Sequence, residues 1–86
     1  MEALRGASGV LHQFTKIERG AGGTKVVEVC DAEACEWDVM RLYAKVFDVG
    51  ASSAELVAPS YTPRAKELAG EYGIKLRNST TRSRTR

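Results

Sequence analysis

The chain has 86 residues, of which 43% are hydrophobic and 28% are charged, and its formal net charge is +2. This length fits one small globular domain and excludes a second. The sequence contains no apolar run of the roughly 18 residues needed to cross a bilayer, and MEALRGASG at its start lacks the apolar stretch of a signal peptide. We therefore expect a cytoplasmic protein with no membrane partner.

The charges are unevenly distributed. Residues 1–76 carry nine Lys or Arg against eleven Asp or Glu, whereas residues 77–86, RNSTTRSRTR, carry four Arg and no acid. With so few apolar groups, residues 78–86 are predicted to form a basic disordered tail. A flexible solubilising terminus explains this composition, and so does an arm for the phosphates of DNA. The candidate nucleic-acid contacts are Arg77, Arg82, Arg84 and Arg86.

The N-terminal third predicts a β-hairpin. Residues 10–17 alternate in a β-like but untidy way, Gly20–Gly23 supply turn conformations, and TKVVEVC follows as a β-branched run. His12, the sole histidine, is expected to have a structural or hydrogen-bonding role. Cys30 and Cys35 lack the partners of a zinc site, so we expect two structural thiols, with a local disulfide as the alternative.

Beyond Cys35 the pattern becomes helical, over residues 36–49, and Gly50 stands where a helix would end. Tyr43 is predicted to pack in the core. Trp37 is predicted to lie in the core or at an interface, and an exposed Trp37 would indicate a contact surface. The apolar residues at spacing i, i+3, i+7 and i+10 are Trp37, Met40, Ala44 and Phe47.

The C-terminal half predicts a strand, a helix and a strand. AELVAP suits a buried strand, Thr62 and Pro63 begin a helix that Gly73 ends, and IKLR forms a last strand. The predicted order is β-β-α-β-α-β. Two helical crossovers make the last three strands parallel and place helices over a mixed sheet. We therefore predict one α/β domain over residues 1–77.

This order, with SGVLHQF before the hairpin and TPRAKELAGEYGIKL near the end, resembles the restriction-endonuclease-like fold, the PD-(D/E)xK superfamily, and in particular its small Mrr-type archaeal and bacterial members. The resemblance covers residues 8–77. It implies a restriction-endonuclease-like core and a connection with DNA. Its best-matching part lies in the C-terminal half, which belongs to the scaffold of that family and not to its active site.

Active members of that superfamily carry an Asp near the start of the second core strand and a Glu-x-Lys or Asp-x-Lys on the paired strand. Two carboxylates hold Mg²⁺ there, and the lysine supports the developing negative charge. In this chain Glu28 takes the acidic place, Cys30 takes the lysine place, and the other acid would be expected close to Thr15. The resemblance therefore implies a degenerate active site without a cofactor.

Displaced residues offer an alternative, a Mg²⁺-dependent DNA endonuclease. Glu28 and Lys45 would be catalytic, with Glu28, Asp31 and Glu18 as candidate metal ligands. The simpler interpretation makes Lys45 a solvated helix charge and Asp31 part of the loop before the helix. We expect a catalytically degenerate domain that acts as a nucleic-acid-associated or protein-interaction module. The second alternative is a homodimeric scaffold without nucleic acid.

Overall fold

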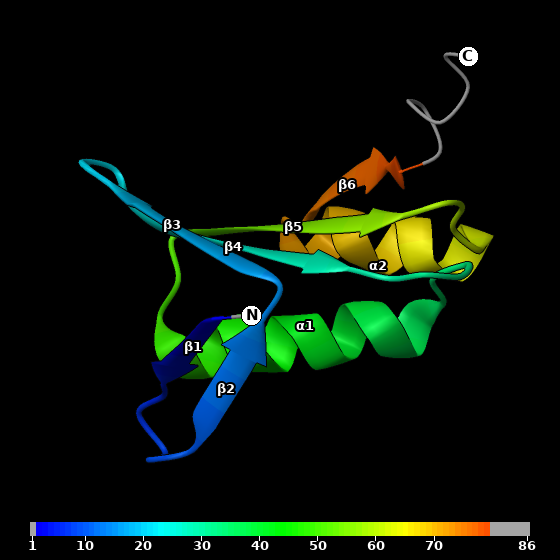
Figure 1. Cartoon of the computed structure of the whole chain (residues 1–86). Coiled ribbons are helices and arrows are strands. Elements are labelled where there is room, and N and C mark those ends of the chain that lie inside the picture. Colours follow the sequence, from blue (N-terminus) through cyan, green and yellow to red (C-terminus); the bar gives the residue numbers. More distant parts are fainter. Residues whose placement is uncertain (1, 80–86) are drawn as a thin grey trace.

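The computed structural model describes residues 2–79, which form a four-stranded sheet, two helices and a separate two-stranded ribbon (Figure 1). None of the described helices is long and apolar enough to cross a membrane. The elements in chain order are β1 (Glu2–Arg5), β2 (Leu11–Phe14), β3 (Lys16–Gly20), β4 (Gly23–Val29), α1 (Glu36–Val49), β5 (Ser53–Ala58), α2 (Pro63–Tyr72) and β6 (Lys75–Asn78).

The sheet has the strand order β3-β4-β5-β6. β3 is antiparallel to β4, whereas β4, β5 and β6 are mutually parallel, which confirms the predicted mixed sheet and its two helical crossovers. Both crossovers step in the same direction across the sheet, so right-handed connections place α1 and α2 on the same face. The two helices contact one another there (Figure 1). Within residues 2–79, no helix covers the other face, which we call the open face.

The N-terminal region differs from the predicted hairpin. The expected strand over residues 10–17 is interrupted at Thr15, and β1, which was not predicted, pairs with β2 in a ribbon of its own. Phe14 is buried and Ile17 packs against the core. These two residues are three apart and cannot share one face of a regular strand. The break resolves this conflict, and the Thr15 hydroxyl accepts a hydrogen bond from the Val29 N–H (3.1 Å).

Helix α1 spans the predicted residues, and the stripe that begins at Trp37 is not the side that enters the core. Val39 and Leu42 are fully buried, whereas Trp37 and Phe47 are 62% and 78% exposed. Tyr43, which was predicted to pack in the core, is instead 38% exposed, and its ring stacks on Tyr72 at 4.1 Å between centroids. The core stripe has the same i, i+3, i+7, i+10 spacing as the exposed one, and it consists of Val39, Leu42, Val46 and Val49.

The helix ends follow the predicted signals. Thr62 caps α2 by accepting a hydrogen bond from the Ala65 N–H (3.1 Å), and Gly50 and Gly73 end the two helices in the left-handed conformation. Asn78, predicted as the start of the tail, instead closes β6. The predicted disorder of residues 80–86, with the candidate contacts Arg82, Arg84 and Arg86, lies outside the described residues.

The ribbon is joined to the C-terminal end of α1 through Asp48. Its carboxylate accepts hydrogen bonds from the Ser8 hydroxyl (2.6 Å) and N–H (3.0 Å), and the His12 Nε2 lies 2.7 Å from it. The hydrogen bond from the Ser8 hydroxyl, followed by the one to His12 and then the one from the Ser8 N–H, lowers the pKa of Asp48. Gly6 passes so close that an added Cβ would lie 2.0 Å from Oδ2 of Asp48. His12 thus has the predicted hydrogen-bonding role.

Candidate functional site

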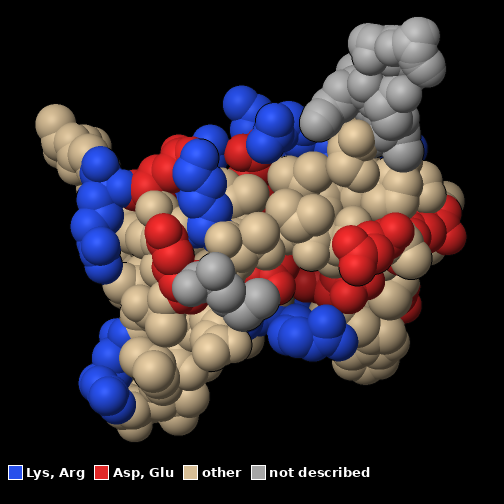
Figure 2. Space-filling model, in the orientation of Figure 1, with Lys and Arg blue, Asp and Glu red and all other residues tan. Residues whose placement is uncertain are grey.

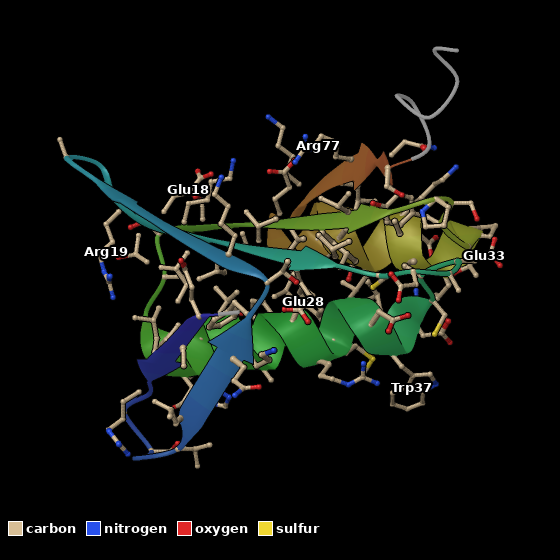
Figure 3. All side chains as sticks on the ribbon, in the orientation of Figure 1. Glu18, Arg19, Glu28, Glu33, Trp37 and Arg77 are labelled. Atoms are coloured by element: carbon tan, nitrogen blue, oxygen red, sulfur yellow. The ribbon has the colours of Figure 1, made fainter. Side chains whose placement is uncertain are left out.

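Glu28 and Lys45 meet between the sheet and α1. Alternation along β4 turns Glu28 toward the helices, as Figure 3 shows, and the Lys45 Nζ lies 3.5 Å from its Oε1. Oε1 of Glu28 is buried and makes no hydrogen bond. The Lys45 ammonium also lies 4.7 Å from the centroid of the Phe14 ring. Lys45 is therefore a half-buried counter-ion for Glu28 and not the solvated surface charge of the simpler interpretation.

A small cavity of about 40 Å³ surrounds this pair, which is room for a few water molecules. Asp38 and Arg41 of α1 contribute to it, although the sequence analysis did not identify them. Asp38, Arg41 and Lys45 are spaced at i, i+3 and i+7, so they fall on one side of α1. This spacing in the sequence could have predicted that Asp38 and Arg41 lie near Lys45. The cavity is lined by Glu28, Cys30, Asp38, Arg41, Leu42, Lys45 and Leu56.

The two cysteines are free thiols, as expected, and Cys30 lies in the cavity. Burial, together with the negative charges of Asp38 and Glu28, raises the pKa of the Cys30 thiol. A thiol is a weak hydrogen-bond donor and carries no positive charge. Cys30 therefore adds no cation to the cavity.

The residues around the cavity do not fit Mg²⁺, which takes several oxygen ligands. The carboxylate of Glu28 is neutralised by Lys45. Asp38 already accepts a hydrogen bond from the Cys35 N–H (2.9 Å) and pairs with Arg41 (3.3 Å). Both of its carboxylate oxygens therefore already have partners at the start of α1. Within residues 2–79 no three His, Cys, Asp or Glu side chains are grouped as metal ligands.

The other two candidate ligands do not complete the site. Glu18 projects from the open face, where it pairs with Lys16 (3.1 Å), whereas Glu28 projects from the covered face (Figure 3). The prediction that Glu18 accompanies Glu28 is therefore wrong. Asp31 lies exposed in the loop before α1, as the simpler interpretation expected, and it does not line the cavity.

A second cluster of charged residues occupies the open face, and its centre is Glu55. The residue is only 4% exposed. It binds the Lys25 Nζ (3.0 Å) and the Arg77 Nε (2.6 Å). Burial alone would raise the pKa of Glu55, but the hydrogen bonds and positive charges of Lys25 and Arg77 outweigh it, so the pKa is lowered. Glu55 thereby fixes two cations on an otherwise uncovered surface.

Two more lysines flank Glu55 on the open face. The strand registers place Lys16 beside Val27, Val27 beside Glu55, and Glu55 beside Lys75, in one row across the sheet. Together the cations surround a shallow hollow of about 450 Å³, far larger than the cavity at Glu28. Of this cluster, only Arg77 was predicted as a nucleic-acid contact. The hollow is lined by Lys16, Glu18, Lys25, Val27, Glu55, Lys75 and Arg77.

The ion pair at Glu28 leads to a test of stability. Lys45→Met is expected to lower the free energy of unfolding by about 1–3 kcal/mol, because Oε1 of Glu28 loses its electrostatic partner while it stays buried. Adding Glu28→Gln should recover part of this loss. Arg64→Met is the control, since its pair with Glu67 is exposed to water and its loss should have little effect on stability. Urea titrations giving equal losses for Lys45→Met and Arg64→Met would contradict this assignment.

Comparisons with known proteins give evidence on the fold. No family model and no curated protein matches the sequence. A crystal structure of a protein of unknown function, AF1548, is similar to this chain with a TM-score of 0.79 and 21% sequence identity. The match covers 92% of this chain and 47% of the other, so this chain spans about half the length of AF1548. At this identity the likeness shows the α/β fold, with its mixed sheet and two packed helices, and nothing about activity.

Proposed function

We propose that this chain is a catalytically degenerate domain of the restriction-endonuclease-like type that binds nucleic acid through its open face. The observation that carries the proposal is the buried Glu55, which holds Lys25 and Arg77 on that face, between Lys16 and Lys75. Figure 2 shows Lys and Arg side chains gathered along this upper side of the molecule, with a few acidic side chains among them.

The chemistry of the face suits a phosphate backbone. Four cations stand against the two acids Glu18 and Glu55, so the face carries a net positive charge although residues 1–76 are acidic as a whole. A lysine or arginine that neutralises a phosphate releases condensed counter-ions, which gives affinity without sequence preference. Because the chain continues from β6 into Arg82, Arg84 and Arg86, these residues follow the open face directly in the sequence.

We propose a non-catalytic domain because of the residues that line the cavity at Glu28. The Lys45 ammonium supplies the positive charge beside Glu28 that a metal ion would otherwise supply, and Cys30 contributes no charge. The alternative, a Mg²⁺-dependent endonuclease, draws support from the meeting of Glu28 and Lys45 in one cavity. Plasmid incubated with Mg²⁺ or Mn²⁺ should remain intact. Metal-dependent nicking that disappears in Glu28→Ala would replace our proposal with this alternative.

Binding is tested by fluorescence anisotropy with a labelled 25-base-pair duplex over a series of salt concentrations. The double variant Lys16→Ala, Lys75→Ala is expected to bind more weakly and to reduce the slope of log K against log salt by about two, since each phosphate contact contributes about 0.9. The control is Arg64→Ala, Lys66→Ala, which removes the same charge from exposed positions on α2. This control should bind nearly as the unmodified protein does.

Two results would count against the open face as the binding surface. The first is an absence of duplex binding at low salt, which would favour a scaffold without nucleic acid. The second is an equal loss of affinity in both double variants, which would indicate general attraction to the protein charge. Replacing Arg82, Arg84 and Arg86 by Ser measures the part of the affinity that comes from the C-terminal residues.

A further inference from the structure

Helix α1 carries a second apolar stripe that faces away from the core. We call it the outer stripe, and it consists of Trp37, Met40, Ala44 and Phe47. Single exposed apolar residues are ordinary in proteins, but a continuous row along a helix marks an interaction surface. Trp, Met and Phe are also residues that interface centres favour. Tyr43, stacked on Tyr72, borders the stripe on the side of α2.

The spacing of the outer stripe suits another helix. Its members follow one another at intervals of three, four and three residues, which is the a and d pattern of a coiled-coil seam. The pattern also reads the same in both directions, with its midpoint at Leu42. An antiparallel copy of α1 would therefore place Trp37 opposite Phe47 of the second copy, and Met40 opposite Ala44 of the second copy. Every apolar position then meets an apolar position. In the two central layers the large Met40 meets the small Ala44.

The charges along α1 complement this arrangement. The end at which α1 begins carries Asp31, Glu33 and Glu36, and the labelled Glu33 lies at that end in Figure 3. The opposite end adjoins the loop that follows Arg5, since the Ala7 N–H binds the Asp48 carbonyl, and Arg19 lies beyond it. The one acid in the last turn of α1, Asp48, is already bonded to Ser8 and His12. In Figure 2 the right side of the molecule carries mainly acidic side chains, whereas the left side carries basic side chains with some acidic ones among them. An antiparallel copy brings each acidic end to a basic end.

We propose that the outer stripe is the interface of a homodimer in which two α1 helices pack antiparallel about a two-fold axis. The contact is isologous, because the same patch serves both copies. The helices and the open face lie on opposite sides of the sheet, so the dimer leaves both open faces accessible and pointing away from each other. The proposal is independent of nucleic-acid binding and stands or falls separately.

Sedimentation velocity over a range of protein concentrations tests the association. The full chain is expected to shift from monomer to dimer, and Phe47→Glu to raise the dimer dissociation constant at least about 30-fold, as for a large aromatic residue that the interface buries. Val29→Glu is the matched control, because it places the same charge at an exposed apolar position on the open side of the sheet. The control should dimerise like the unmodified chain. Circular dichroism is used to check that both variants are folded.

Trp37 provides a second measurement, since it is the single tryptophan of the chain. Its emission is expected to shift to shorter wavelength with rising concentration in the unmodified chain and in Val29→Glu, but not in Phe47→Glu. The antiparallel orientation is tested by charge exchange. Glu33→Lys alone should weaken the dimer, and Glu33→Lys combined with Arg5→Glu should restore it, because an antiparallel copy brings the end that carries Glu33 to the end that carries Arg5.

Three outcomes would overturn the proposal. A chain that stays monomeric throughout the concentration range has no such interface, whether or not it binds an unrelated protein through the outer stripe. Equal weakening by Phe47→Glu and Val29→Glu would place the contact elsewhere. Failure of Arg5→Glu to restore the dimer of Glu33→Lys would exclude the antiparallel arrangement.

Discussion

Replacing Phe14 by alanine is expected to lower the free energy of unfolding by about 3–5 kcal/mol. Phe14 is 1% exposed and is the largest fully buried side chain of the core. Its truncation removes apolar contacts and leaves a cavity where the ribbon joins the sheet, and it removes the ring beneath the Lys45 ammonium. For a domain of this size the loss is a large part of the total stability.

Urea titration followed by circular dichroism measures this effect. Phe14→Leu keeps most of the apolar volume and is expected to cost much less, about 1–2 kcal/mol, so the comparison remains informative if the alanine variant does not fold. Leu11→Ala in the same strand is the control, because Leu11 is about half exposed and should lose no more than about 0.5 kcal/mol. Similar losses for Phe14→Ala and Leu11→Ala would show that Phe14 does not anchor the ribbon.

Glu55→Gln is expected to lower the free energy of unfolding by about 1–3 kcal/mol near neutral pH, because a buried carboxylate loses two charge-assisted bonds. Water reaches Lys25 and Arg77 and solvates them once Glu55 is neutral, which keeps the loss below that of a fully buried ion pair. The same change should weaken duplex binding less than the loss of Lys16 and Lys75 does, since both partner cations remain. Thermal unfolding and anisotropy provide the two measurements.

The pH dependence follows from the lowered pKa values of Glu55 and Asp48. A carboxylate with a lowered pKa in the folded state contributes stability above its unfolded value, 4.5 for Glu55 and 3.8 for Asp48, and loses it as the pH falls through the folded value. The melting temperature should therefore fall on acidification below about pH 4.5. Glu55→Gln should show a shallower fall. An identical fall in both proteins would mean that Glu55 does not contribute to acid sensitivity.

The elements that the sequence predicted correctly have local causes. The start of α2 depends on Thr62 and Pro63, and the ends of both helices on Gly50 and Gly73, within a few residues of the backbone groups that they affect. The parallel order of β4, β5 and β6 also follows locally, since each pair is joined by one helix. The spacing of Phe14 and Ile17 in the sequence could have predicted the break at Thr15. Strand β1 could not be predicted from its own residues, because it is recognised only through its pairing with β2.

The arrangement of the candidate site was less predictable, because the relevant distances span separate elements. Lys45 reaches Glu28 only once α1 has crossed back over β4, and Asp38 and Arg41 arrive with it. Glu18 and Glu28 lie on paired strands, but the register across the Gly20–Gly23 turn sets them on opposite faces of the sheet. A shift of one residue in that register would have turned Glu18 toward the helices.

The sequence by itself determined the helices, their ends and the mixed sheet, since these depend on residue types and short spacings. Tertiary structure decided which side of α1 enters the core. The stripes that begin at Trp37 and at Val39 have identical spacing, so periodicity cannot choose between them. The branched aliphatic residues of the core stripe pack between α1 and the sheet, and the larger aromatic residues Trp37 and Phe47 remain outside. That choice leaves the outer stripe available for a partner.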